Sequence, residues 1–136
     1  MPEWNPNRGK IGQLDPELAV YLVAVTWTDR PDGSKAKCWH DLDHFDPSAI
    51  KRARADLDEF KIKAAALGVL QDDLDRWEDF SGQTWQTDFW LTRNGHGCGF
   101  WEEEGTIAER LDQVAKSMGP CYTWAAHGRI YLEREC

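Results

Sequence analysis

The clearest pattern in the chain is a helical period of apolar residues between residues 46 and 68. These side chains recur at steps of three and four, which places them on one face of an α-helix: Ile50, Ala53, Leu57, Phe60, Ala64 and Leu67. Asp46 is a good N-cap, Pro47 suits the first helical position, and Gly68 is a typical stop. The pattern predicts one long amphipathic helix that packs on a core.

Two other segments also predict helices. Asp15 and Pro16 repeat the cap-and-proline start, and apolar residues follow at helical spacing over residues 16–28. The valines of this segment would also suit a buried strand, but the start signal favours a helix. Residues 105–118 have an apolar face at helical spacing and end at Gly119-Pro120.

The C-terminal half predicts two β-hairpins. From Gln86 the pattern is strand-like, with Phe89 and Leu91 on one face and Asp88, Trp90 and Thr92 on the other. The sequence from Asn94 to Gly97 is a strong tight-turn signal, and residues 99–101 resume an extended chain. A second hairpin is expected on either side of Ala126-His127-Gly128, with strands over residues 121–125 and 129–133.

Together these elements predict an α+β fold. Its antiparallel sheet would have about four strands, from a ββαββ arrangement over residues 86–133, and would pack against two to four helices. We expect a single domain over residues 1–136, with a loose arm over residues 1–13 and a mainly helical part over residues 14–80.

The charge balance argues against nucleic acid as the partner. The chain has 24 Asp and Glu against 16 Lys and Arg, a formal net charge of −8. No basic surplus is available to displace counterions from phosphates, so direct nucleic-acid binding is disfavoured.

The longest apolar run, Leu18 to Trp27, is about half of the roughly 20 residues that a membrane-spanning helix needs. Since the first residues also lack a signal-peptide pattern, we expect a cytoplasmic protein without a membrane segment.

Cysteine and histidine give only a weak metal signal. Four cysteines are expected to be free thiols: Cys38, Cys98, Cys121 and Cys136. The candidate metal ligands are Cys38, His40 and His44, with His96, Cys98, Cys121 and His127 as further donors. Only the His40–His44 spacing matches a zinc knuckle, and Cys38 lies too close to His40 for one. The sequence therefore predicts no metal site and no cofactor.

The most distinctive stretch is the glycine-rich segment after residue 86. Its alternating glycines suit a tight hairpin turn, and an anion-binding nest is disfavoured by the glutamates at 102–104. His96 could act as a general acid or base with Asp88 as its partner, although a loop histidine without a task is the simpler interpretation. As a binding surface, the candidate residues are Trp90, Arg93, Asn94, Gly95, His96, Gly97, Gly99 and Trp101.

Acidic residues form a second candidate surface. The densest run comprises Asp72, Asp73, Asp75, Glu78 and Asp79, and the glutamates at 102–104 add to it. Such a run is either a solvated face or a negative surface that meets a basic partner. The chain also has eight tryptophans, most of which we expect in the core, while exposed ones would be binding hot spots.

Three stretches carry a resemblance: DFWLTRNGHGCGFWE at residues 88–102, AKSMG at residues 115–119 and GRIYLE at residues 128–133. Here the sequence resembles a family of small acidic proteins encoded by bacteriophages and related mobile elements. The resemblance implies such an origin and a helical N-terminal part, and it carries no activity with it. In the family pattern a small residue such as Ala is common at position 98, which disfavours a metal or nucleophile role for Cys98.

These observations predict a non-enzymatic phage accessory protein that binds a host protein in the host cytoplasm. The partner could be a nuclease or another basic protein, and the binding could inhibit a defence system, as anti-restriction and anti-CRISPR proteins do. One alternative is a small enzyme, a hydrolase or a nucleotide-modifying enzyme, that uses His96. Another is a structural-zinc or nucleic-acid-binding module. The oligomeric state is left open by the sequence.

Overall fold

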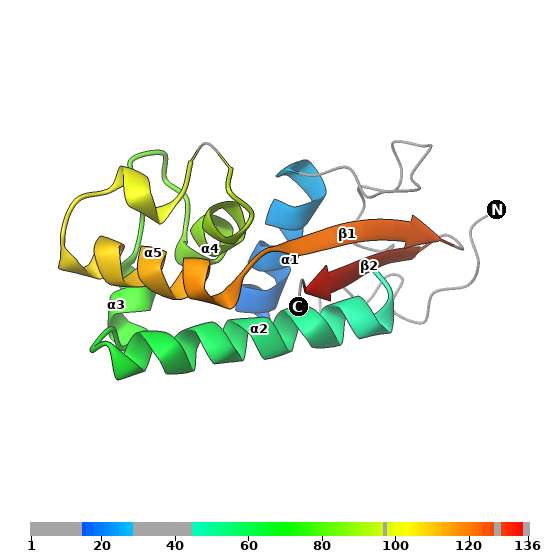
Figure 1. The fold of residues 1–136 in the computed structure, drawn as a ribbon, viewed down its shortest axis with the longest axis horizontal. Coiled ribbons are helices and arrows are strands. Elements are labelled where there is room, and N and C mark those ends of the chain that lie inside the picture. The colour runs from blue at the N-terminus through cyan, green and yellow to red at the C-terminus, as the bar shows by residue number, and fades with distance from the viewer. Residues whose placement is uncertain (1–14, 29–44, 97, 127–128, 135–136) are drawn as a thin grey trace.

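The structure is a computed structural model, and it describes residues 15–28, 45–96, 98–126 and 129–134. Its elements are α1 (Pro16–Thr28), α2 (Pro47–Ala66), α3 (Gln71–Arg76), α4 (Trp85–Arg93), the 3₁₀ turn η4 (Phe100–Glu102), α5 (Thr106–Met118), β1 (Cys121–Ala126) and β2 (Arg129–Arg134). Helix α2 runs along one side of the molecule, with α5 over one half of it and the β-hairpin over the other (Figure 1). The predicted α+β class is confirmed.

The two helix starts that the sequence predicted are present. Asp46 Oδ2 accepts a hydrogen bond from the Ser48 amide at 2.9 Å, and Pro47 occupies the first turn of α2. Asp15 Oδ1 accepts from the Glu17 amide at 2.9 Å at the start of α1. Beyond α2, Gly68 adopts a φ of +87°, which accommodates the change of direction into α3.

The first predicted hairpin is wrong, because residues 85–93 form helix α4. Every residue of α4 is buried, including Thr87 and Thr92. A helix buried on all sides has no polar face, so its sequence lacks the amphipathic period that identifies surface helices. Among the described residues the sheet therefore has two strands, β1 and β2, instead of about four.

Stacked aromatic rings fill the core between these helices. Phe60 of α2 lies with its ring centroid 4.4 Å from Phe89 and 5.3 Å from Trp85, both on α4. Phe100 of η4 stacks on the same Phe60 ring at 5.8 Å, and Tyr21 of α1 packs against Phe89 at 5.6 Å. This cluster joins α1, α2, α4 and η4 into one core.

The second predicted hairpin is confirmed as β1 and β2, paired antiparallel. Trp124 faces Tyr131 across the strands, with stacked rings 4.2 Å apart. The Asp46 amide donates to the Ile130 carbonyl at 2.9 Å, which ties the start of α2 to β2. No helix within the described residues has the length and apolar character to cross a membrane.

Candidate functional site

Two segments that are distant in sequence form one acidic end of the molecule. We define the acidic end as residues 71–84 and 99–112, which include α3, η4 and the start of α5. The rings of Trp77 and Phe100 hold the segments together, with centroids 5.4 Å apart. The acidic end has ten carboxylates and two arginines, whereas the other described residues have eight carboxylates and nine Lys and Arg. The negative charge of the described chain is therefore concentrated here.

The surface of the acidic end is hollowed by two grooves that share Glu104, Gly105 and Ala108. The larger has a volume of about 580 Å³, and its lining residues are Asp73, Arg76, Trp77, Glu78, Glu104, Gly105, Thr106, Ile107 and Ala108. The smaller has a volume of about 440 Å³, and its lining residues are Phe100, Trp101, Glu103, Glu104, Gly105, Ala108, Glu109 and Asp112. Each groove thus combines apolar side chains with several carboxylates.

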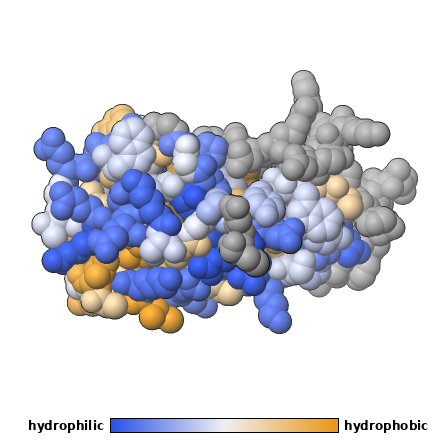
Figure 2. Space-filling model, in the orientation of Figure 1, coloured by the Kyte–Doolittle hydropathy of each residue, from blue (hydrophilic) through white to orange (hydrophobic). Residues whose placement is uncertain are grey.

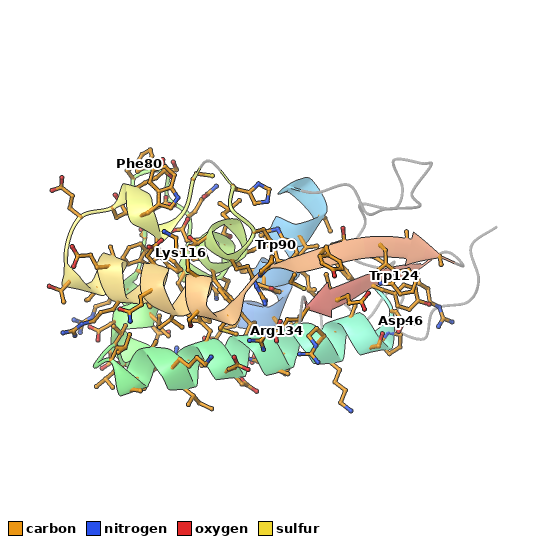
Figure 3. All side chains as sticks on the ribbon, in the orientation of Figure 1. Asp46, Phe80, Trp90, Lys116, Trp124 and Arg134 are labelled. Atoms are coloured by element: carbon orange, nitrogen blue, oxygen red, sulfur yellow. The ribbon has the colours of Figure 1, made fainter. Side chains whose placement is uncertain are left out.

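Large apolar side chains are also exposed among these charges. Trp101 is 52% exposed and Phe80 is 71% exposed, unusually high values for side chains of this size. Figure 3 shows Phe80 at the same end of the molecule as the η4 turn, which carries Trp101, and shows Trp124 toward the opposite end. In the space-filling view this end is mostly hydrophilic, with separate hydrophobic patches (Figure 2).

Beneath this surface lies a buried group of carboxyls centred on Asp88 of α4. Asp88 is fully buried, and its Oδ2 accepts a hydrogen bond from Trp77 Nε1 at 2.9 Å. Its Oδ1 has no hydrogen-bond partner among the described residues. Burial, together with the nearby carboxyls of Asp79 and Glu102, raises the pKa of Asp88 to about 8. Asp88 is therefore mostly a neutral carboxylic acid at pH 7.

Two further groups affect this region: the carboxyl of Asp79, which is buried, and the thiol of Cys98, which is partly exposed. Asp79 Oδ1 accepts from the amides of Ser81 and Gln83 at 2.8 and 2.9 Å, so this carboxylate organises the loop between α3 and α4. Burial, with the charges of Glu102, Asp88 and Asp79, raises the pKa of the Cys98 thiol. A thiol with a raised pKa is a poor nucleophile near pH 7, because little thiolate is present.

Two of the predicted surface residues are core residues. Trp90 is fully buried, and Arg93 is 4% exposed. Arg93 donates to Asp56 Oδ2 at 2.8 Å, to Tyr21 Oη at 3.1 Å and to the Gly119 carbonyl at 2.9 Å. Neither residue can contact a partner in this conformation, and Arg93 links α1, α2 and α4 to the end of α5.

The predicted turn after α4 is a helix end whose glycines have structural roles. Asn94 Nδ2 donates to the Trp90 carbonyl at 3.0 Å, and its Oδ1 accepts from the Cys121 amide at 2.8 Å. Gly95 has a φ of +70° and is exposed. Gly99 has a φ of +149°, and an added Cβ there would overlap Thr92 Oγ1. Gly97 lies outside the described residues.

The two residues of the predicted acid–base pair, His96 and Asp88, have different surroundings. The strongest effects on Asp88 come from its burial, Trp77, Asp79 and Glu102, and its complete burial separates it from any substrate in solvent. The His96 amide donates to the Leu91 carbonyl at 3.0 Å, at the C-terminal end of α4. Catalysis by His96 with Asp88 therefore stays a prediction.

Most of the candidate metal ligands lie outside the described residues, whereas the whole acidic run lies within them. Cys38, His40, His44, His127 and Cys136 lie outside the described residues, and within the described part no group of three or more His, Cys, Asp or Glu is arranged to hold a metal ion. Cys98 and Cys121 are free thiols. Of the acidic run, Asp72, Asp75 and Glu78 are exposed and Asp73 is partly exposed, but Asp79 is buried.

Sequence reasoning missed Glu109 and Asp112, which line the smaller groove. Both lie on the polar side of a helix that the sequence predicted. The sequence did not show, however, that this helix lies next to η4 and forms a groove with it. Comparison of the chain with family models, with curated proteins and with solved structures finds no match.

Proposed function

We propose that the protein is a non-enzymatic binding protein whose acidic end docks on a basic segment of a host protein. The observation that carries the proposal is the position of Trp101, which is half exposed beside a groove that Glu103, Glu109 and Asp112 also line. An exposed tryptophan contributes binding energy by burying its ring, and the surrounding carboxylates select a positively charged partner.

The larger groove supports the same proposal. Trp77, Ile107 and Ala108 supply apolar lining, while Asp73, Glu78 and Glu104 supply negative charge. This arrangement is complementary to a segment in which an apolar side chain is flanked by Lys or Arg. Binding of an acidic ligand, including nucleic acid, is opposed by the charge repulsion of this end.

A nuclease is the partner class that best combines these features with the resemblance to phage proteins. Enzymes that hold nucleic acid present basic grooves to its phosphates, and a compact acidic protein can occupy such a groove in place of the nucleic acid. Under this proposal the protein inhibits a host defence nuclease, as anti-restriction and anti-CRISPR proteins do.

The chemistry of the surface is tested by calorimetric titration with a short peptide of Arg residues around one Leu. We expect binding that weakens as salt rises toward about 0.15 M, and no binding of the peptide with Glu in place of Arg. Trp101→Ala should weaken binding about tenfold. The matched control is Trp124→Ala, because Trp124 is 37% exposed on the hairpin toward the opposite end. Equal losses in both variants would contradict the proposal.

The nuclease version is tested in cells. Expression of the protein should protect an infecting phage from restriction, and a triple variant, Glu103→Lys with Glu104→Lys and Glu109→Lys, should give no protection. Glu133→Lys changes the charge of an exposed position on β2 and should protect like the wild type. Full protection by the triple variant would rule out this end as the contact surface.

A further inference from the structure

The smaller groove combines an aromatic ring with carboxylates from two elements. It lies where η4 packs against α5, and its base includes Phe100 and Ala108, which are both buried. Trp101 lines it from η4, while Glu109 and Asp112 line it from α5, three positions apart and so on neighbouring turns of one helix face. An indole and two carboxylates thus border one cavity of about 440 Å³.

The charge of this groove is more one-sided than that of the larger groove. Its carboxylates are those of Glu103, Glu104, Glu109 and Asp112, and no lysine or arginine of the described residues lines it. Lys116 pairs with Asp112 Oδ2 at 2.9 Å and offsets one of the four negative charges. The larger groove, in contrast, includes Arg76 in its lining. A cation is therefore attracted more strongly to the smaller groove than to the larger one.

Asp112 also has an acceptor that no described residue uses. Its Oδ2 is paired with Lys116, whereas its Oδ1 is buried and has no hydrogen-bond partner among the described residues. A buried acceptor without a donor costs free energy. Because Asp112 lines the groove, a cation with several N–H groups can supply the missing donor.

These surroundings suit a guanidinium group better than an ammonium group. The guanidinium of arginine is flat, so it stacks on the face of an indole, and its N–H groups form a fork that can bind two carboxylate oxygens at once. The ammonium of lysine is compact and strongly hydrated, and it has no flat face to stack. Trp101, which is half exposed, provides the ring, and Glu109 and Asp112 provide the oxygens.

We infer that the smaller groove is an arginine-specific site, in which a guanidinium of the partner stacks on Trp101 and donates to Glu109 and Asp112. This inference rests on the proposed function, since it names the side chain that the acidic end recognises. The larger groove adjoins the site at Glu104 and Ala108, and it receives the apolar side chain of the same segment.

Two peptides of equal charge test the specificity. The first is the peptide of Arg residues around one Leu, and the second has Lys in place of every Arg. We expect the Arg peptide to bind about tenfold more tightly in calorimetric titration. Equal affinities would overturn the arginine site and leave the proposed function in place, because charge alone would then explain docking. If neither peptide binds, the proposed function fails and the arginine site fails with it.

A pair of aromatic variants tests the role of the indole. Trp101→Leu keeps an apolar side chain but removes the flat ring, so the ratio of the two Kd values should fall from about ten to about two. Phe80→Leu is the matched control, because Phe80 is an exposed ring at the same end and lines neither groove (Figure 3). This control should keep the wild-type ratio. An equal fall of the ratio in both variants would overturn the inference.

A pair of charge variants tests the carboxylates in the same way. Glu109→Gln should weaken the Arg peptide about fivefold and the Lys peptide about twofold, because only the guanidinium loses part of a forked contact. Glu78→Gln removes one exposed charge from the larger groove and should weaken both peptides by the same factor. An equal effect of Glu109→Gln on the two peptides would overturn the assignment of Glu109 to the arginine site.

Discussion

We call the part of the molecule around β1 and β2 the hairpin end. Carboxyl groups there lie next to arginines, whereas the buried carboxyl beneath the acidic end lies near other carboxyls. Near the hairpin, Glu59 of α2 accepts from Arg134 through both oxygens, at 3.0 and 3.1 Å, and Asp46 pairs with Arg129 at 3.0 Å. Beneath the acidic end, Asp88 of α4 accepts a hydrogen bond from the Trp77 indole and lies within the influence of the Asp79 carboxyl. The Arg134 pair lowers the pKa of Glu59 to about 2, whereas burial among carboxyls raises the pKa of Asp88 to about 8.

The two ends should therefore respond to pH in opposite directions. The Glu59 pair stabilises the fold above the ordinary pKa of 4.5, and this contribution disappears as the pH falls toward 2. Asp88 binds its proton more tightly in the folded protein, so its contribution is complete below 3.8 and is lost as the pH rises toward 8. A fall in pH below 4.5 therefore weakens the hairpin end, and a rise in pH from 3.8 to about 8 weakens the packing around Asp88.

We expect the largest loss of stability at the fully buried ion pair between Arg93 and Asp56. Arg93→Met should lower the free energy of unfolding by about 3 to 5 kcal/mol, because it leaves the buried carboxylate of Asp56 without its 2.8 Å partner. Arg52→Met removes a largely exposed partner of the same carboxylate and should cost less than about 1 kcal/mol. Urea unfolding measures both, and similar costs would show that burial does not govern this pair.

A smaller effect is expected at the glycine that leads from α4 into the acidic end. Gly99→Ala should destabilise by about 2 to 3 kcal/mol, because its Cβ would overlap Thr92 Oγ1 at a φ of +149°. Gly95→Ala is the control, since it has a φ of +70° and open space around its Cβ, and it should cost about 1 kcal/mol. Thermal unfolding of the two variants tests the close approach, and an equal change in Tm would contradict it.

The smallest loss of stability is expected at Glu59, whose substitution also tests the different pH responses of the two ends. Glu59→Gln should cost about 0.5 to 1 kcal/mol at neutral pH, because the ion pair with Arg134 is partly exposed. The variant should also lose part of the acid sensitivity between about pH 4.5 and 2, while its loss of stability as the pH rises from about 5 to 8 should match that of the wild type. Unfolding measured across this pH range checks both statements. A changed response between about pH 5 and 8 would mean that the two ends are coupled.

The sequence predicted those elements whose signals are local. Asp46 and Pro47 marked the start of α2, and the hairpin over residues 121–133 was also correct. Helix α4 was not predicted, because its polar residues bind distant partners: Arg93 contacts Gly119 and Asp56, and Asp88 contacts Trp77. Tertiary burial on all sides leaves no local pattern that distinguishes such a helix from a strand.

The candidate site was predicted only in part, for the same reason. The acidic run was found as a set of charges, but nothing local shows that Asp79 turns inward toward Asp88. Hydropathy likewise assigns the same value to Trp90 and Trp101, although the first is fully buried and the second is half exposed. Which tryptophan is available to a partner depends on how η4 and α4 pack.

The uneven charge of the described residues gives the molecule an electric dipole along its length. Ten carboxylates and two arginines lie in the acidic end, while charges elsewhere nearly balance. In the field of a basic partner, such a dipole turns the protein before the surfaces touch, so that η4 and the start of α5 arrive first. Encounter would then be faster than the area of the grooves alone implies, and this advantage would vanish in concentrated salt.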